Sequence, residues 1–129
     1  MEAHPPYVAP SGFRIGHVHL RVGNVEQAER FYIGTAGLER TQRLGGSATF
    51  LANGRYHHHI GANIWQSRNA GLRKDTMSGL EFLAFSVSAP LMDGLRDRLK
   101  TDGADFHEQG DVIDALDPWG TKVRFVPRA

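Results

Sequence analysis

The fold is decided by the stretch IGHVHLRV, residues 15–22. Apolar and polar side chains alternate through much of it, which is typical of a β-strand with one buried face. Asn24 follows as a helix N-cap, with Gln27 in the capping-box position three residues later. The apolar residues that come next have helical spacing, and the helix is expected to end at a glycine; they are Val25, Ala28, Phe31 and Tyr32, followed by Gly37. The sequence therefore opens with a strand and an amphipathic helix.

Three more short strands follow, near residues 38–44, 48–52 and 56–65. Gly45-Gly46 and Asn53-Gly54 lie between them as turn signals. The first half of the chain thus has the pattern βαβββ, and its last expected strand contains a run of three histidines, 57–59.

The second half repeats this pattern. A strand over 80–87 leads to a helix with Pro90 near its first turn and an apolar stripe of Leu91, Leu95 and Leu99, and the helix ends at Gly103. Strands near 104–109, 112–116 and 122–126 follow, with a turn at 117–120 (Asp-Pro-Trp-Gly). The offset between the halves is 65 residues when Val22 is set on Val87, and 66 when Gly54 is set on Gly120.

The repeat predicts an α+β fold in which two tandem βαβββ modules form a curved eight-stranded mixed sheet around a cleft, because neither half could bury its sheet alone. Residues 1–12 are expected to form a flexible tail, and 13–129 a single domain. In it, module 1 spans 13–65, a linker spans 66–78, and module 2 spans 79–129.

Composition excludes several classes of protein. The chain has 129 residues with 40% hydrophobic and 22% charged side chains, which is typical of one globular domain. It has no cysteine, which excludes disulfides, thiolate metal sites and a cysteine nucleophile. Its net charge is +1, which gives no basis for binding nucleic acid or a membrane. No signal peptide or membrane span is evident, and we expect a soluble cytoplasmic protein.

The residues that carry the repeat resemble those of a known superfamily, the vicinal oxygen chelate proteins, which include glyoxalase I, bleomycin-resistance proteins and extradiol dioxygenases. Residues 15–22, with Ala28–Tyr32 and Gly37-Leu38, resemble its opening module. The run 56–61 (YHHHIG) is similar to members related to catechol 2,3-dioxygenase, and the turn 117–120 resembles the one before the last strand in many members. The resemblance implies the paired βαβββ fold, a small-molecule ligand and a homodimer, with the modules paired within one chain or swapped between two.

The resemblance also implies four ligand positions, on the first and last strand of each module, and a metal held by two histidines and a carboxylate. The first-module positions fall on His17 and His58, and the latter resembles an acid–base residue in the dioxygenases. The second-module positions fall on Phe82 and Arg124, neither of which can coordinate a metal ion. The usual metal set is therefore incomplete. A bulge or register shift would turn Glu81 inward and complete a site of His17, His58 and Glu81.

The remaining candidates have structural alternatives. Alternation along a strand would place Tyr56, His58 and Ile60 on the cleft side, with His57 and His59 facing away. His19 points the same way as His17 and is expected either to bind substrate or to be a packed core histidine. Arg124 is expected to anchor an anionic ligand oxygen, or to pair with Glu81 or Asp111. The other residues assigned to the cleft wall or core are Tyr56, Phe50, Phe82 and Trp65, while His107 is assigned to the surface and Trp119 to packing.

These residues favour a small-molecule enzyme that acts on an oxygenated, aromatic substrate with an atypical or lost metal centre. His17 and His58 would be catalytic, and Arg124, His19, Tyr56, Phe82 and Trp65 would bind substrate. One alternative is a metal-dependent dioxygenase or glyoxalase using Fe, Mn, Zn or Ni. Another is a non-catalytic protein that binds a small molecule such as an antibiotic, and a further one is a subunit whose surface binds another protein. The sequence leaves the reaction, the substrate and the presence of a metal open.

Overall fold

The computed structural model describes residues 6–74, 77 and 79–129. The first five residues of the expected tail, and residues 75, 76 and 78 of the expected linker, lie outside the described part. The first module contains β1 (Val18–Arg21), α1 (Val25–Glu29), the π-helical turn η1 (Arg30–Thr35), β2 (Glu39–Leu44), β3 (Ala48–Ala52) and β4 (Ile60–Asn63). The second contains β5 (Leu83–Ser88), the 3₁₀ turn η2 (Ala89–Leu91), α2 (Met92–Thr101), β6 (Phe106–Gln109), β7 (Val112–Leu116) and β8 (Lys122–Arg128).

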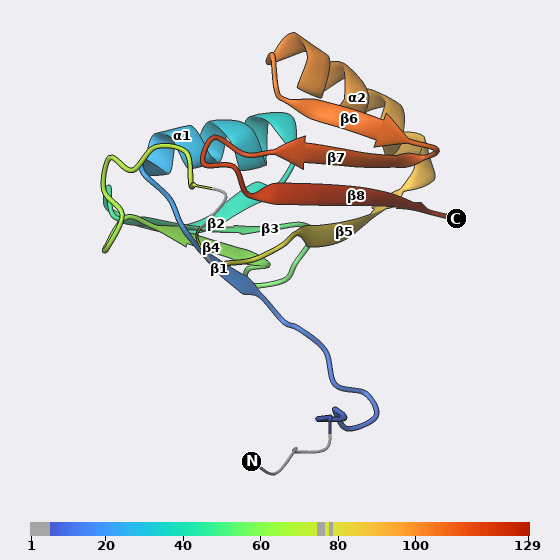
Figure 1. Ribbon diagram of the computed structural model, residues 1–129, viewed down its shortest axis with the longest axis horizontal. Coiled ribbons are helices and arrows are strands. Elements are labelled where there is room, and N and C mark those ends of the chain that lie inside the picture. The colour runs from blue at the N-terminus through green and yellow to red at the C-terminus, as the bar shows by residue number, and fades with distance from the viewer. Residues whose placement is uncertain (1–5, 75–76, 78) are drawn as a thin grey trace.

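The strand order confirms the repeat. Each module forms a four-stranded mixed sheet, with order β1-β4-β3-β2 in the first and β5-β8-β7-β6 in the second. In both sheets the first strand pairs parallel to the last, and the other pairs are antiparallel. The α+β prediction of two tandem βαβββ modules is confirmed, with the eight strands divided into two sheets of four (Figure 1).

Local sequence signals explain the helices. The side chain of Asn24 accepts a hydrogen bond of 2.8 Å from the backbone N–H of Gln27, which makes Asn24 the N-cap of α1 as predicted. Gly37 and Gly103 both have positive φ, of 90° and 67°, and follow the two helices. The expected stripe of α2 is wrong at one position. Leu91 is 62% exposed because it lies in the 3₁₀ turn that precedes α2.

Three strands begin at least three residues later than their sequence patterns predict. β1 begins at Val18 and β5 at Leu83, because each extends only as far as its parallel partner, with Val18 opposite Ile60 and Leu83 opposite Val123. β4 begins at Ile60, so residues 56–59 form a loop instead of the expected strand. This loop is where the histidine run lies.

One hydrophobic core joins the modules. It includes buried side chains from the strands and helices of both. The hydroxyl of Tyr32 in η1 donates a hydrogen bond of 2.7 Å to the carboxylate of Asp117 in the second module, and both residues are buried. Thr35 likewise donates a bond of 2.6 Å to Asp102, beyond α2. These bonds fix the two modules to each other.

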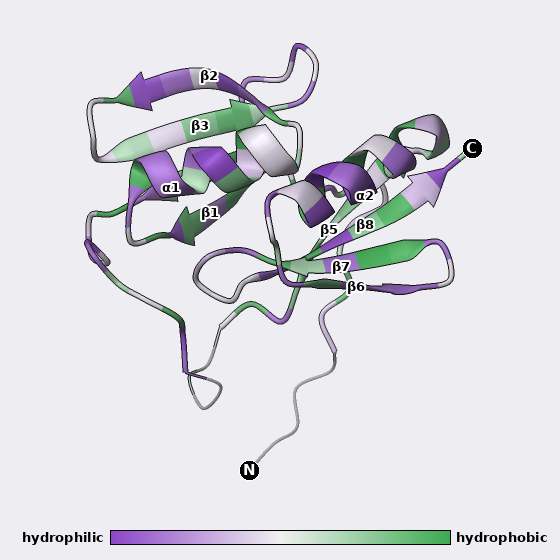
Figure 2. Cartoon of the chain, turned by 90° about the horizontal axis from the view of Figure 1, so that it is seen from above, coloured by the Kyte–Doolittle hydropathy of each residue, from purple (hydrophilic) through white to green (hydrophobic). Residues whose placement is uncertain are grey.

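One edge strand of each sheet differs from the strand beside it. Figure 2 shows that β2 and β6 are mainly hydrophilic, whereas their neighbours β3 and β7 are largely hydrophobic. Polar edge strands discourage pairing with other chains. Among the described residues, no helix has the length and apolar character required to cross a membrane.

A candidate site built from histidines

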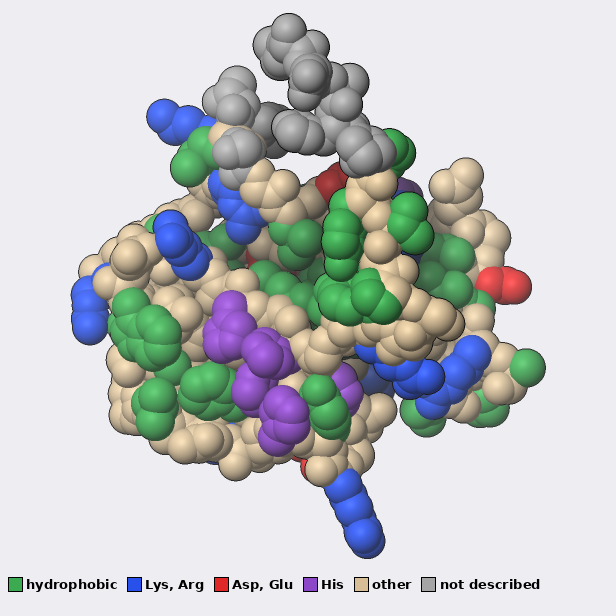
Figure 3. Space-filling view, turned by 90° about the horizontal axis from the view of Figure 1, so that it is seen from below, with side chains coloured by type: hydrophobic (Ala, Val, Ile, Leu, Met, Phe, Trp, Pro, Cys, Tyr) green, Lys and Arg blue, Asp and Glu red, His purple; other side chains and the backbone are tan. Residues whose placement is uncertain are grey.

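Three histidines of the first module lie together on one face. His19 is in β1 and His17 lies two residues before it, so both side chains point to the same side. His58 comes from the loop before β4. The backbone N–H of Val18 donates to the carbonyl of His59 at 2.9 Å, and this bond holds the two segments side by side. Parallel pairing of β1 with β4 therefore assembles the cluster, which Figure 3 shows as a patch of histidine side chains.

The rings are close enough to act on one molecule or ion. Each of His17, His19 and His58 offers a ring nitrogen, and these three atoms lie within 4.8 Å of one another. The ring centroids of His17 and His58 are 4.4 Å apart, and those of His17 and His19 are 4.9 Å apart. His17 and His19 are exposed and His58 is half-buried. We call these three residues the histidine cluster.

Hydrogen bonds position the loop that carries His58. The hydroxyl of Thr41 in β2 donates to the carbonyl oxygens of His57, at 2.6 Å, and Phe50, at 3.2 Å. The backbone N–H of His59 donates to the carbonyl of Leu51 at 2.8 Å, and a ring nitrogen of His59 accepts from the backbone of Asn53 at 3.2 Å. The loop is therefore anchored to β2 and β3.

The aromatic surroundings of the cluster differ in part from the prediction. The ring of Phe50 lies 5.1 Å from that of His58 and 6.5 Å from that of His19, as a wall of the site. The Tyr56 ring stacks on that of His59 at 4.5 Å and is tilted against that of His57 at 4.2 Å. The expectation that His57 faces away from the cluster is wrong, because its ring lies 4.6 Å from that of His58. Strand alternation does not apply to a loop.

The His19 ring packs against a glycine of the neighbouring strand. A Cβ added to Gly61, the residue paired with His19 in β4, would lie 2.8 Å from Nδ1 and 2.9 Å from Cε1 of that ring. Such contacts are too short for a side chain to be tolerated without movement. The His19 ring therefore lies over the backbone of Gly61, in space that any larger residue would fill.

His58 has an uncommitted nitrogen. Its Nε2 atom is buried and has no hydrogen-bond partner within the described part of the chain, while its Nδ1 lies 3.0 Å from Nδ1 of His57. Burial, and then the neighbouring imidazoles with His17 first, lower the pKa of His58 below its ordinary value, so the ring is neutral at pH 7. If its Nδ1–H donates to His57, the lone pair of Nε2 is free to accept a proton or to bind a cation.

Arg124 does not join the histidine cluster. It lies opposite Asp114 across the β7–β8 pair, and its Nε and Nη2 atoms donate to that carboxylate at 2.8 and 3.0 Å. The hydrogen bonds from Arg124 lower the pKa of Asp114 below its ordinary value. The guanidinium also lies 4.2 Å from the centre of the Phe82 ring, a cation–π contact. Of the expected alternatives, an internal ion pair is present, but its partner is Asp114 rather than Glu81 or Asp111.

Arg124 instead lines a hollow of about 340 Å³ on the second module, with Asp114, His107 and neighbouring residues of β6, β7 and β8. None of the three histidines of the cluster lines it. The hollow at Arg124 and the histidine cluster therefore share no lining residue.

The metal set that the resemblance implies does not fit these residues. Phe82 and Arg124 occupy the second-module positions and are packed against each other. Glu81 is exposed, and its electrostatic neighbour is Arg124. Within residues 6–74, 77 and 79–129, the group of three or more histidines and carboxylates with converging ligand atoms consists of the histidine cluster alone, without Glu81. Trp65, the remaining expected wall residue, is 61% exposed beyond the end of β4.

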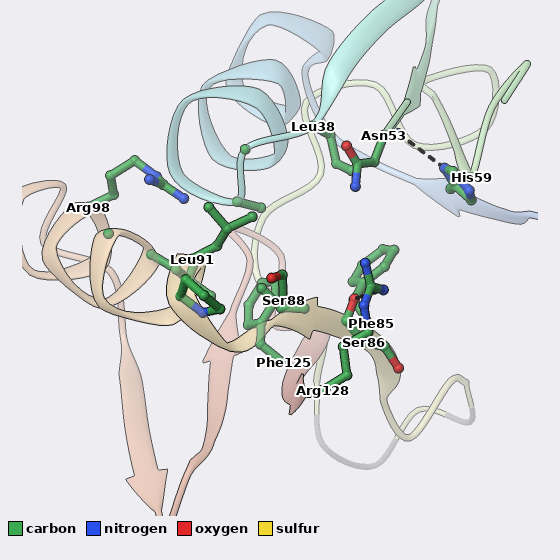
Figure 4. A pocket seen from close by; sticks show the side chains of 16 residues that line it. Leu38, Asn53, His59, Phe85, Ser86, Ser88, Leu91, Arg98, Phe125 and Arg128 are labelled. Atoms are coloured by element: carbon green, nitrogen blue, oxygen red, sulfur yellow. Dashed lines mark hydrogen bonds between the residues drawn. The ribbon is translucent and has the colours of Figure 1, made fainter. Parts of the chain in front are cut away.

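A cavity of about 550 Å³ lies between the modules, and sequence reasoning missed it (Figure 4). Leu38, Asn53 and His59 line it from the first module, and Phe85, Leu91 and two arginines, Arg98 and Arg128, from the second. His59 is the member of the histidine run that reaches it. No local signal could have identified this cavity, because it arises where the two modules pack together.

No protein-family model matches the chain. Over 122 residues, or 91% of its length, it is 35% identical to a catechol-2,3-dioxygenase of Bacillus subtilis (strain 168), and it spans 42% of that relative. A glyoxalase/dioxygenase from Nostoc punctiforme superposes with a TM-score of 0.70 at 14% identity, covering 98% of this chain and 100% of the other.

A glyoxylase/bleomycin resistance protein/dioxygenase domain from Frankia sp. EAN1pec superposes with a TM-score of 0.68 at 21% identity, covering 92% and 100%. Likenesses at these identities show the fold, and the curated relative adds sequence similarity along nearly the whole chain. The chain therefore has the fold of the glyoxalase, bleomycin-resistance and dioxygenase proteins, which confirms the resemblance to the vicinal oxygen chelate superfamily.

Proposed function

We propose that the chain is an enzyme that acts on a small oxygenated aromatic molecule at the histidine cluster. The observation that carries this proposal is the free Nε2 of His58, buried next to two other imidazoles. A buried acceptor without a donor is uncommon in a folded protein, and such groups gather where a ligand completes the hydrogen bonding. The name of the curated relative, a catechol-2,3-dioxygenase, favours a phenolic substrate.

The chemistry follows from three imidazole rings beside aromatic walls. A phenolic or enolic hydroxyl placed among them would give its proton to Nε2 of His58, leaving an oxyanion on the substrate and an imidazolium on the protein. His17 and His19 would donate hydrogen bonds to that oxyanion. Phe50 and Tyr56 would contact the ring of the substrate. The hollow at Arg124 does not enter this scheme, because the carboxylate of Asp114 already occupies its guanidinium.

The test uses 4-nitrocatechol as a probe, because its ionised form absorbs visible light. The chain is freed of metal and mixed with the probe below the pH at which the free probe ionises. We expect the spectrum of the anion, and we expect it to disappear in His58→Gln. His107→Gln is the matched control, since His107 is an exposed histidine on β6. An unchanged spectrum in His58→Gln, with the fold intact by circular dichroism, would contradict the proposal.

A binding protein without catalysis is the second candidate. The packed set of Phe82, Arg124 and Asp114 favours it, because this set leaves no cation ligand at the second-module positions. The discriminating result is tight binding of a phenol with no product after prolonged incubation.

We also propose that the chain forms a homodimer in which a second copy covers the face of the histidine cluster. His17 and His19 are exposed in the single chain, so a substrate bound there would remain open to water on one side. Light scattering at several protein concentrations measures the mass directly, and a monomer throughout the series would contradict this part of the proposal.

A further inference from the structure

We propose that His17, His19 and His58 form a binding site for a divalent transition-metal ion, built entirely from the first module. The site differs from the expected set of two histidines and a carboxylate, because it replaces Glu81 with His19 and needs no residue of the second module. The inference rests on the proposed function in one respect: the ion would lie in the cluster where substrate is proposed to bind.

The distances suit such an ion. A tetrahedral zinc ion binds imidazole nitrogens at about 2.0–2.1 Å, which places those nitrogens roughly 3.4 Å apart. The cluster already holds its three nitrogens within 4.8 Å of one another. His17 and His19 are exposed, so small rotations of their side chains can close the remaining distance. Three ligands on one side leave the fourth position open to water or to an oxygen of the substrate.

The donors select the kind of ion. All three are imidazole nitrogens, and the group contains no carboxylate. Imidazole suits zinc, nickel, copper and cobalt, whereas calcium and magnesium prefer oxygen ligands. A divalent ion of the first kind is therefore the chemical class that fits.

Two features indicate that the cluster is built rather than accidental. The ring of His19 fits over Gly61, where any Cβ would lie within 2.8 Å of Nδ1. Nδ1 of His58 lies 3.0 Å from Nδ1 of His57, and a hydrogen bond at one nitrogen of a histidine orients the other toward a metal. That other nitrogen, Nε2, is buried and without a partner among the described residues.

The second module supplies no metal ligand at the positions that the resemblance implies. The Phe82 ring carries no donor, and the guanidinium of Arg124 is positive and bonded twice to Asp114. Glu81 lies within the electrostatic reach of that guanidinium. The proposed site therefore uses neither of the two second-module positions, Phe82 and Arg124, at which the resemblance would place metal ligands.

The experiment is a titration of the full chain, without a tag and stripped by a chelator, with Zn²⁺ alone by calorimetry. A parallel titration with Co²⁺ is followed by visible absorption, which reports the number and geometry of the ligands. We expect one ion per chain. His19→Gln should weaken binding by about 100-fold or more, which exceeds the 10–100-fold typical of a residue that only supports a ligand. Glu81→Gln and His107→Gln should bind as the parent does.

Three results would overturn the inference: no stoichiometric binding by the parent, unchanged binding in His19→Gln, or loss of binding in Glu81→Gln. Melting curves followed by circular dichroism establish that each variant is folded. The proposed function and the proposed metal site can be tested separately. Ionisation of 4-nitrocatechol by the metal-free chain, lost in His58→Gln, would support that function even if no ion binds. Binding of Zn²⁺ without ionisation of the probe would support the metal site alone.

Discussion

Replacing Gly61 with alanine tests how the histidine cluster is built. The new Cβ would lie 2.8 Å from Nδ1 and 2.9 Å from Cε1 of His19, and ordinary contact begins near 3.4 Å. The ring must therefore move by about 0.6 Å. The methyl group would push the ring away from the place where it is proposed to bind the ion. Groups that support a metal ligand typically contribute 10–100-fold to affinity, so we expect Co²⁺ or Zn²⁺ affinity to fall by roughly tenfold.

Stability should respond in the opposite way. The atoms that the new methyl group meets belong to an exposed side chain that can rotate, and the backbone of Gly61 is not in the left-handed region. Alanine also loses less conformational entropy than glycine in a strand, by roughly 0.5–1 kcal/mol. We therefore expect an equal or slightly higher melting temperature together with weaker metal binding.

Gly46→Ala is the matched control, because Gly46 has no positive φ and a Cβ there meets no atom within 4 Å. Metal affinity is measured by calorimetry, and stability by thermal unfolding. Parent-like affinity in Gly61→Ala would refute the argument that His19 is a ligand held over Gly61. A large fall in the melting temperature would instead show that the ring cannot move, and would refute the estimate of the stability.

Three further predictions concern the frame around the site. Arg124 holds the pKa of Asp114 below its ordinary value of 3.8. The pair therefore stabilises the fold above pH 3.8, and this stabilisation is lost as the pH falls through the lower pKa of the folded state. Asp114→Asn should flatten the acid side of a plot of melting temperature against pH, and an unchanged slope would contradict this. Tyr32→Phe removes the donor to the buried carboxylate of Asp117, and urea unfolding should show a loss of about 1–3 kcal/mol, with a parent-like midpoint as the contrary result. Leu51→Ala empties space at a fully buried position of β3 and should cost about 2–5 kcal/mol by the same assay, whereas a cost below 1 kcal/mol would be inconsistent with the packing.

Much of the fold could be predicted because the same pattern of strands and helix occurs in both halves of the sequence. Two copies of one βαβββ pattern, at an offset of 65 residues, carry β1 onto β5, and the two sheets have the same strand order. Capping at Asn24 and the glycines after the helices are local signals, and both are confirmed. Strand ends were less predictable, because the length of β1 is set by its partner β4, and β4 begins only at Ile60.

The candidate site could be predicted only in part, because the loop that carries His58 is also positioned by neighbouring strands. His19 lies in β1 and His17 directly before it. Their side chains share a face because they are two residues apart, which the sequence predicts directly. The position of His57 could not be derived from alternation, because Tyr56 to His59 form a loop held by the hydroxyl of Thr41. That bond depends on how β2 lies beside the loop, which no local pattern contains.

The partner of Arg124 illustrates a signal that the sequence did carry. Asp114 and Arg124 lie five residues on either side of Trp119, in the turn that joins β7 to β8. A hairpin centred on that turn pairs residues at equal distances from its centre, and opposite charges across such a pair attract. Counting outward from the turn would have identified Asp114 in place of Glu81 or Asp111.

The pairing of Asp114 with Arg124 also explains why the two modules differ in chemistry despite their common fold. The offset of 65 residues sets His17 on Phe82, so the same point of the repeat carries an imidazole in one module and an apolar ring in the other. In the second module the guanidinium covers that ring and is itself bound by Asp114, so its charge is balanced locally. In the first module, Nε2 of His58 is buried without a hydrogen-bond partner among the described residues. Since a reaction needs groups that are not already satisfied by the fold, we expect the proposed chemistry to take place in the first module.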